Sequence, residues 1–435
     1  MLQDWFVDAK FGVFLHWGIY STGRTSESWD FFTGRVPYDE YMAQAAEFTA
    51  EHYDPDAWAH LIAQAGAKYA VLTTKHHDGF ALWPTKENSW NAIESSPAGR
   101  DLVGPFCEAL RKVGVKVGLY YSHLDWSHPD YASVLPLKKH WFTGGCTNRF
   151  GYPQNGEDPQ AWERFLAFHR AQLKELCVQY KPDLLWFDGD WERDDDQWRF
   201  AELREQLHEW APGVVLNSRM GGSTKARLDG EGDYMTPEQA IPLQAPPKMW
   251  EFCCTTNDHW GYFEGDDNFK PASHCIRMLA ECAGMGGNLL LNIGPKADGS
   301  LPSEPVEILE KIGRWTQRHA EALYGTRAGL PNGYFYGAST LSSDQTTIYL
   351  FDFSIPRGEI AVKGIRNEIK RISVVGSGAE LKHRKLGGAP WAGLPGILWI
   401  EVPQNALDAD ATVFKIELEG PLDLHFGIGE ILHSA

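Results

Sequence analysis

Side chains that can perform acid–base chemistry or bind hydroxyl groups gather at the ends of apolar runs. These ends are His16-Trp17-Gly18, Lys75-His76-His77-Asp78-Gly79-Phe80, Tyr120-Tyr121-Ser122-His123, Trp186-Phe187-Asp188-Gly189-Asp190-Trp191, Asn217-Ser218-Arg219, Glu251, and Asn292 with Gly294. Carboxylates can act as nucleophile or general acid, while imidazoles and a guanidinium can bind hydroxyl groups. Aromatic rings can pack against the apolar face of a sugar. The combination indicates a site for carbohydrate chemistry.

The sequence lacks the motifs that several other enzyme classes need. His76 and His77 are adjacent on a predicted strand, so their side chains point to opposite faces and make a poor metal chelate. There is no His-x-His on a strand, no His-Glu-x-x-His on a helix and no Gly-x-Ser-x-Gly elbow. A Gly-x-Gly-x-x-Gly fingerprint after a strand is also missing. We expect neither a metal nor another cofactor, and a metal-dependent hydrolase stays open as an alternative.

The apolar runs alternate with amphipathic helical segments. The predicted strands are Phe11–Trp17, Tyr69–Thr74, Val115–Ser122, Asp183–Asp188, Val214–Asn217, Met249–Phe252 and Asn288–Ile293. The predicted helices are Asp54–Ala65, Leu102–Val113, Pro159–Tyr180, Gln197–Trp210, Ala272–Ala283 and Glu304–Leu323. This order predicts an α/β fold, a TIM-type (β/α) barrel over residues 1–328, whose catalytic groups lie at the C-terminal ends of the strands. Seven strands are clear, so one element of the barrel is expected to be degenerate.

The pattern changes after Gly325. Short runs with alternating hydrophobicity follow, separated by Gly, Pro, Asn and Asp; they are Thr347–Phe353, Glu359–Ile365, Ile372–Val375, Leu398–Val402 and Val413–Glu419. Alternation with a period of two is typical of antiparallel strands with one buried face. Residues 329–435 are therefore predicted to form a C-terminal antiparallel β-sandwich.

Composition narrows the partners and the compartment. The net charge is −18 with no run of Lys or Arg, which argues against nucleic acid or an anionic membrane as a partner. No apolar run approaches the length of a membrane-spanning helix, and the N-terminus has no basic region followed by an apolar stretch. Seven Cys, with Cys253 and Cys254 adjacent, indicate free thiols rather than a disulfide framework. These features predict a cytoplasmic protein without a signal peptide.

An ordered set of short segments resembles the α-L-fucosidase family of glycoside hydrolases. The segments are Phe11-Gly12-Val13-Phe14-Leu15-His16-Trp17-Gly18, Lys75-His76-His77-Asp78-Gly79-Phe80, Gly118-Leu119-Tyr120-Tyr121-Ser122, Leu185-Trp186-Phe187-Asp188-Gly189, Thr236-Pro237-Glu238, Trp250-Glu251-Phe252 and Asn288-Leu289-Leu290-Leu291-Asn292-Ile293-Gly294-Pro295. Each is short, but they occur in the family's order and cover nearly the whole predicted barrel. The resemblance implies a barrel followed by a β-sandwich, and a retaining reaction through a covalent fucosyl-enzyme.

The resemblance also implies a role for individual residues. Asp188 matches the nucleophile, and Glu238 matches the general acid/base. The residues that match contacts to the sugar are His16, Glu27, Trp29, His76, His77, Tyr121, Trp186, Arg219, Glu251 and Trp260. No cofactor is implied, and the expected partner is a fucosylated oligosaccharide or glycoconjugate. Oligomeric state, for which a homo-oligomer is one option, and linkage specificity are not determined by the sequence.

Some positions depart from the family pattern or leave a choice open. The family often has a Glu-Trp pair after the first strand, where this chain has Glu27-Ser28-Trp29. Glu251 is a rival for the acid/base role, and Glu231 is a weaker one. Between Tyr120 and Tyr121, we favour Tyr121 because it lies nearer the strand end. A catalytically inactive sugar-binding protein is a second alternative to an enzyme, and the intact Asp188 argues against it.

Overall fold

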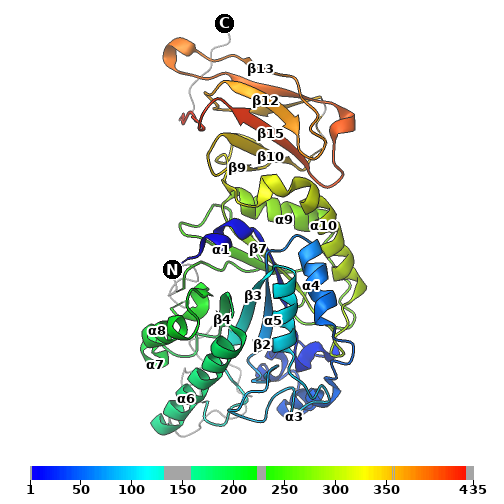
Figure 1. Ribbon diagram of the computed structural model, residues 1–435, viewed down its shortest axis with the longest axis vertical. Helices are drawn as coiled ribbons and strands as arrows, with labels where there is room; N and C mark the ends of the chain where they lie inside the picture. The colour runs from blue at the N-terminus through cyan, green and yellow to red at the C-terminus, as the bar shows by residue number, and fades with distance from the viewer. Residues whose placement is uncertain (1, 132–157, 223–231, 355, 357, 428–435) are drawn as a thin grey trace.

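The computed structural model describes residues 2–131, 158–222, 232–354, 356 and 358–427. A unit built on a parallel sheet and a unit of antiparallel sheets lie end to end (Figure 1). Helices α9 (Ala272–Gly284) and α10 (Ser303–Leu323) lie between them. In the described residues, no helix is long and apolar enough to cross a membrane.

Seven parallel strands form the first sheet, in the order β5-β4-β3-β2-β1-β7-β6. They are β1 (Phe11–Leu15), β2 (Tyr69–Lys75), β3 (Lys116–Ser122), β4 (Leu184–Asp188), β5 (Val215–Leu216), β6 (Glu251–Thr255) and β7 (Asn288–Ile293). Each overlaps a predicted strand, with ends that differ by a few residues. Continuous apolar runs therefore identified the strands correctly, because both faces of this sheet are buried.

The two edge strands of this sheet, β5 and β6, do not pair directly in the described residues. Tyr234 and Met235 lie between them and form only isolated bridges, to Asn217 on one side and to Trp250 on the other. The backbone N–H of Met235 donates to Met249, and that of Glu251 donates to Met235. Regular pairing thus gives a curled seven-stranded parallel sheet.

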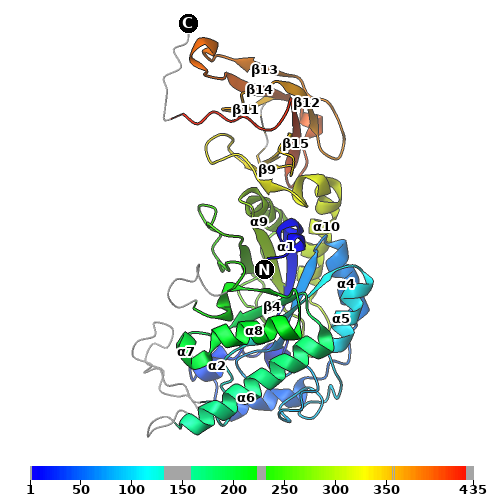
Figure 2. The ribbon, with the colours of Figure 1, turned by 60° about the vertical axis from the view of Figure 1, so that its left-hand side comes forward.

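Helices cover the outer face of the parallel sheet (Figures 1 and 2). Besides α9 and α10, they are α4 (Pro55–Gln64), α5 (Val103–Lys112), α6 (Pro159–Glu175), α7 (Asp195–Trp198) and α8 (Phe200–Trp210); the short α1 (Asp4–Ala9), α2 (Trp29–Phe32) and α3 (Tyr38–Ala43) were not predicted. The side chain of Asp54 caps α4 by accepting from the backbone of Ala57. The single helix predicted over 197–210 is divided at Arg199, whose φ is +54°.

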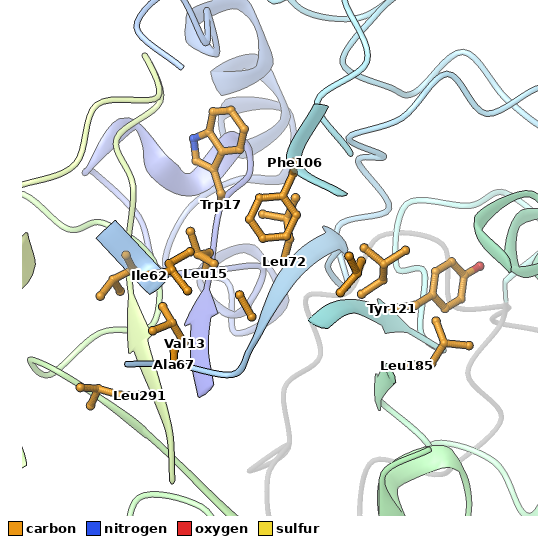
Figure 3. Packing of buried hydrophobic residues seen from close by; sticks show 14 of the residues in the cluster. Val13, Leu15, Trp17, Ile62, Ala67, Leu72, Phe106, Tyr121, Leu185 and Leu291 are labelled. Carbon is orange, nitrogen blue, oxygen red and sulfur yellow. The ribbon is translucent and has the colours of Figure 1, made fainter. Parts of the chain in front are cut away.

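Side chains of the parallel sheet alternate between two hydrophobic clusters. The inner cluster takes residues from all seven strands, which means that the sheet curls around it; its members include Phe14, Tyr69, Tyr120, Trp186, Val215, Cys253 and Leu290. The outer cluster lies between the sheet and the helices, and Figure 3 shows Val13, Leu15, Leu72, Tyr121, Leu185 and Leu291 there. Sequence parity along each strand therefore decides which side chains face the interior of the curl.

The C-terminal unit consists of two antiparallel sheets, β12-β15-β10-β9-β8 and β11-β14-β13. Their strands are β8 (Arg327–Ala328), β9 (Ala338–Leu341), β10 (Thr347–Asp352), β11 (Gly358–Val362), β12 (Ile369–Val374), β13 (His383–Leu386), β14 (Ile397–Val402) and β15 (Thr412–Leu418). Residues of both sheets share one buried cluster, which includes Leu350, Ile360, Ile400 and Phe414. The sequence did not predict β8, β9 and β13, which are short and, in β8 and β13, largely exposed.

We expect Gly12→Ala to destabilise the protein. A Cβ atom at Gly12 would lie 2.4 Å from the ring of Tyr69, inside van der Waals contact. That ring cannot easily give way, because it packs on Phe6 and its hydroxyl donates to Glu251 at 2.5 Å. Overpacking of this kind costs about 1–3 kcal/mol of unfolding free energy. Denaturant titration measures it, with exposed Glu205→Ala as the control, which should stay within about 0.5 kcal/mol of wild type. Equal stability of the two variants would contradict the packing described here.

Candidate active site

A cavity of about 160 Å³ opens at the C-terminal end of the parallel sheet. Its lining residues are Phe14, His16, Glu27, Trp29, His76, Tyr120, Trp186, Asp188, Trp191, Arg219, Glu238 and Trp260. Nine of these are residues that the sequence marked as site residues. Strand ends and the loops after them thus bring side chains from distant parts of the chain to one place, as expected for a sheet of this kind.

Two carboxylates at the cavity share one arginine. Asp188 is the last residue of β4, and its Oδ1 accepts from Nη1 of Arg219 at 3.0 Å. Glu238 accepts from Nη2 of the same guanidinium at 2.5 Å, through its Oε2. The second oxygen of Asp188 accepts from the hydroxyl of Tyr120 at 3.3 Å. One planar guanidinium therefore fixes how close the two carboxylates lie to each other.

Arg219 is itself held on several sides. Its Nε donates to Oγ1 of Thr236 at 3.2 Å, and its guanidinium lies over the ring of Trp186, 4.8 Å from the centroid. Burial lowers the pKa of Arg219, but the charges of Glu238 and Asp188 outweigh it and raise that pKa well above its ordinary value. The guanidinium is a permanent positive charge between two carboxylates.

Asp188 and Glu238 differ in how their backbones are supported. Asp188 belongs to a strand that pairs with β3 along its length, and Gly189 then turns the chain with a φ of +86°. A Cβ atom at Gly189 would lie 2.6 Å from Leu124, so glycine fits the tight turn. Glu238 has only an isolated bridge to Cys253, and Gln239 after it has a φ of +57°, a conformation that costs energy for residues other than glycine.

Hydrogen bonds on Nδ1 determine the tautomers of His77 and His16. The hydroxyl of Ser122 donates to the carbonyl of Leu124 at 2.7 Å, so its oxygen accepts from Nδ1–H of His77 at 2.6 Å. The amide of Asn292 donates to Trp260, so its oxygen accepts from Nδ1–H of His16 at 2.7 Å. The Nε2 atoms of His77 and His16 are thereby left as hydrogen-bond acceptors.

The third histidine, His76, bonds to Ser28. The oxygen of Ser28 accepts from the backbone N–H of Asp78 at 3.0 Å and lies 2.7 Å from Nδ1 of His76. Burial lowers the pKa of His16 and of His77 to about 3, and that of His76 well below its ordinary value, so all three rings are neutral near pH 7. Neutral imidazole nitrogens of this kind can bond to hydroxyl groups.

Aromatic rings form the walls of the cavity. Trp29 and Trp191 are stacked, with centroids 6.2 Å apart and an interplanar angle of 16°. Trp260 packs against His16 at 4.9 Å and against Phe14 at 6.1 Å. Trp186 lies beneath Arg219. A polar group surrounded by rings is the arrangement expected of a sugar pocket, whose ligand has hydroxyl groups on its edge and apolar C–H faces.

Three predicted site residues lie away from the cavity surface. His77 is fully buried, but its Nε2 lies 3.6 Å from Oδ2 of Asp188 and has no hydrogen-bond partner among the described residues. Glu251 is buried beneath Trp186. Tyr121 points to the outer cluster (Figure 3), and its hydroxyl donates to Gln172. Glu231 lies outside the described residues.

The choice of Tyr121 over Tyr120 is corrected by this placement. In the pairing of β3 with β4, Tyr120 is opposite Trp186 and Ser122 is opposite Asp188, so these four residues share the inner face. Closeness to the strand end was the wrong criterion, because side chains alternate between the faces. Parity with Asp188 would have found Tyr120. Phe14, two residues before His16, follows from the same rule, whereas Trp191 lies in a loop that parity does not place.

The described residues contain no group of three or more His, Cys, Asp or Glu side chains that could hold a metal ion. Lys75, the last residue of β2, is buried and turned to Asp125 at 3.5 Å. The chemistry of the cavity is thus that of carboxylates, one guanidinium, neutral imidazoles and aromatic rings.

Comparison with known proteins finds the same family by sequence and by structure. A family model described as alpha-L-fucosidase matches residues 1–321. The tissue alpha-L-fucosidase of Mus musculus is 35% identical over 349 residues, which are 75% of this chain and 72% of the mouse protein. Alpha-L-fucosidase isoenzyme 1 of Paenibacillus thiaminolyticus superposes with a TM-score of 0.83 at 33% identity, over 95% of this chain and 98% of that one. A trapped covalent intermediate of a Bacteroides thetaiotaomicron alpha-L-fucosidase with 2-fluoro-fucosyl fluoride also gives 0.83, at 26% identity and 96% coverage of each chain.

Glu27→Gln should change how stability depends on pH. Burial raises the pKa of Glu27 to about 7 in the folded protein, from an ordinary value of 4.5. Between these values the folded state holds a proton that the unfolded state has released, so the stability of the wild type falls as pH rises. The glutamine variant has no such proton. Its stability relative to wild type should therefore increase between pH 4.5 and 7, by on the order of 3 kcal/mol.

Denaturation at a series of pH values measures this difference. Exposed Glu40→Gln is the matched control. A pH-independent offset for Glu27→Gln would show that Glu27 ionises like an exposed carboxylate.

Proposed function

The chain belongs to the α-L-fucosidase family of glycoside hydrolases, and we propose that Asp188 is the nucleophile and Glu238 the general acid/base of its retaining reaction. The Bacteroides relative forms a covalent intermediate, which is the defining species of a retaining glycosidase. The substrate is a fucosylated oligosaccharide or glycoconjugate, from which the enzyme removes a terminal α-L-fucosyl residue.

The sharing of Arg219 by Asp188 and Glu238 is the observation that carries this assignment. Two carboxylates bound to one guanidinium can be no further apart than two hydrogen bonds and the width of that group allow. Retaining glycosidases need a short separation of about 5–5.5 Å, because one carboxylate must reach the anomeric carbon while the other reaches the glycosidic oxygen. Of the rivals to Glu238, Glu251 is buried beneath Trp186 and has no access to a leaving group.

The reaction then proceeds in two steps. An oxygen of Asp188 attacks the anomeric carbon, the bond to the leaving oxygen breaks, and Glu238 gives its proton to that oxygen. In the second step Glu238 takes a proton from water, the water oxygen attacks the anomeric carbon, and the bond to Asp188 breaks. Two inversions give net retention. Asp188, on a strand paired with β3 along its length, offers the fixed placement that a nucleophile benefits from.

The remaining cavity residues bind the sugar. The acceptor on His16 and the imidazole of His76 match hydroxyl groups, which can both donate and accept, and His77 holds a further acceptor outside the cavity lining. Trp186 and Trp260 face the apolar edge of the ring. Tyr120 takes the place first given to Tyr121, since its hydroxyl bonds to Asp188. Glu27 and Trp29 line the cavity as the family pattern implies, in spite of the intervening Ser28.

The proposal also covers the architecture of the two units and the cellular location of the protein. The curled sheet acts as an irregular (β/α) barrel in which Tyr234 and Met235 stand for the eighth strand. Residues 1–328 are the catalytic unit, and residues 329–435 are a β-sandwich that contributes no residue to the cavity as described. The six cysteines in the described residues are free and buried, which supports a reducing, cytoplasmic location.

Asp188→Ala should abolish turnover and leave the fold intact. Loss of a covalent nucleophile is expected to lower kcat for an aryl α-L-fucoside by at least ~1,000-fold, about 4 kcal/mol of barrier. Azide should restore part of the activity by entering the vacated space, and the product should be the fucosyl azide of inverted configuration. Asp183→Ala, immediately before the same strand, is the control and should keep wild-type turnover. Activity of Asp188→Ala within tenfold of wild type would contradict the assignment of Asp188 as the nucleophile.

Glu238→Ala should show an effect that depends on the leaving group. A nitrophenyl fucoside needs little protonation, so its first step should persist and a covalent fucosyl–Asp188 species should accumulate. A fucosylated disaccharide has a poor leaving group and should lose roughly 100-fold or more in kcat/KM. Mass spectrometry of the intact protein detects the adduct, and exposed Glu264→Ala serves as control. Equal losses on both substrates, without an adduct, would contradict the acid/base role.

A further inference from the structure

Glu251, the first residue of β6, is a carboxylate buried inside the curled sheet. Three neutral donors surround it. Its Oε2 accepts from the hydroxyl of Tyr69 at 2.5 Å, and its Oε1 accepts from the indole N–H of Trp186 at 2.8 Å and from the hydroxyl of Tyr234 at 3.3 Å. These donors come from β2, from β4 and from the segment between β5 and β6. One side chain thus connects three parts of the sheet.

A carboxylate at this depth is costly unless its hydrogen bonds serve some purpose. Burial raises the pKa of Glu251 to about 7, against a smaller lowering by the charge of Arg219, and its printed hydrogen bonds among the described residues all come from neutral donors. An apolar side chain of similar size would fill the same volume without that cost. Packing of the core does not require an ionisable group at this position, so the hydrogen bonds of Glu251 point to another role.

Trp186 bonds to Glu251 through its N–H and faces the cavity with its ring. The guanidinium of Arg219 lies 4.8 Å from the ring centroid, and the ring of Tyr120 is stacked on it at 5.7 Å with an angle of 19°. Arg219 and Tyr120 are the two residues that, in the described part of the chain, donate to the carboxylate oxygens of Asp188. Glu251 is therefore connected to Asp188 through a single indole.

We propose that Glu251 is a positioning residue that fixes the indole of Trp186 and, through it, the donors that orient Asp188. The inference rests on the proposed function, since it concerns the alignment of the proposed nucleophile. Without the acceptor on Glu251, the N–H of Trp186 would be buried without a partner and the ring would turn to find one. Arg219 and Tyr120 would lose the surface on which they lie. Displacements of about 1 Å in such a site can cost about 100-fold in rate.

The test compares Glu251→Leu with Glu251→Gln. Leucine keeps most of the volume but accepts no hydrogen bond, and kcat for an aryl fucoside should fall by about 100-fold with little change in KM. Glutamine keeps an acceptor oxygen for Trp186 and should stay within about tenfold of wild type. The loss in Glu251→Leu should be the same for an aryl fucoside and a fucosylated disaccharide, because a positioning residue transfers no proton to the leaving group.

A double-mutant cycle identifies the connection through Trp186. Trp186→Phe keeps a ring but has no N–H, so it should lower kcat by itself by at least about tenfold. Adding Glu251→Leu to Trp186→Phe should then cost less than about threefold more, since the hydrogen bond is already absent. Additive losses would overturn the proposal, as would wild-type turnover of Trp186→Phe. The latter result decides the matter even if Glu251→Leu does not fold.

Two further outcomes separate this inference from the function on which it rests. An active wild type with an equally active Glu251→Leu overturns the positioning role alone. A loss in Glu251→Leu confined to the disaccharide also overturns it, because that pattern belongs to a general acid. Absence of fucosidase activity in the wild type would overturn the proposed function and the inference together.

Discussion

The ion pairs between Arg219 and the carboxylates of Asp188 and Glu238 are the constraint on which the site depends. Two like charges in a partly buried cavity repel each other, and the repulsion grows as water is excluded. A guanidinium between them offsets that repulsion and, because it is planar with fixed donors, also sets their geometry. Thr236 and Trp186 hold the guanidinium in turn. Strand ends from several parts of the sheet must therefore meet at Arg219.

The neutrality of the other polar groups follows from that constraint. No other lysine or arginine lines the cavity in the part of the chain described here, and the histidines stay uncharged because burial keeps their pKa values low. A second cation would weaken the negative potential that Asp188, as the proposed nucleophile, must present to a developing positive charge at the anomeric carbon. Serine and asparagine side chains instead orient the imidazoles by hydrogen bonds, so the imidazoles can bond to hydroxyl groups without adding charge.

Local sequence signals placed the strands of the sheet and most of the cavity, but not the direction of each side chain. Continuous apolar runs identified β1 to β7, because strands buried on both faces need them. They also concealed the alternation that separates Tyr120 from Tyr121, since both faces are apolar. Glu251 was predicted as a site residue because it follows Trp250 at the end of an apolar run. Its position below Trp186 becomes visible only when the strands are paired. The division of the helix at Arg199 depends on tertiary packing.

The proposed acid/base differs from the nucleophile in what it must do, and its surroundings differ accordingly. A carboxyl group that delivers a proton cannot at that moment hold a full ion pair, so Glu238, as the proposed acid, has to be protonated while it accepts from Arg219. Asp188 stays ionised in its proposed role, and its strand pairs with β3 along its whole length. Glu238 is tied to β6 by one bridge and is followed by the left-handed Gln239. The proposed nucleophile thus lies on regular backbone, whereas the proposed acid/base lies on irregular backbone, and Arg219 bonds to both.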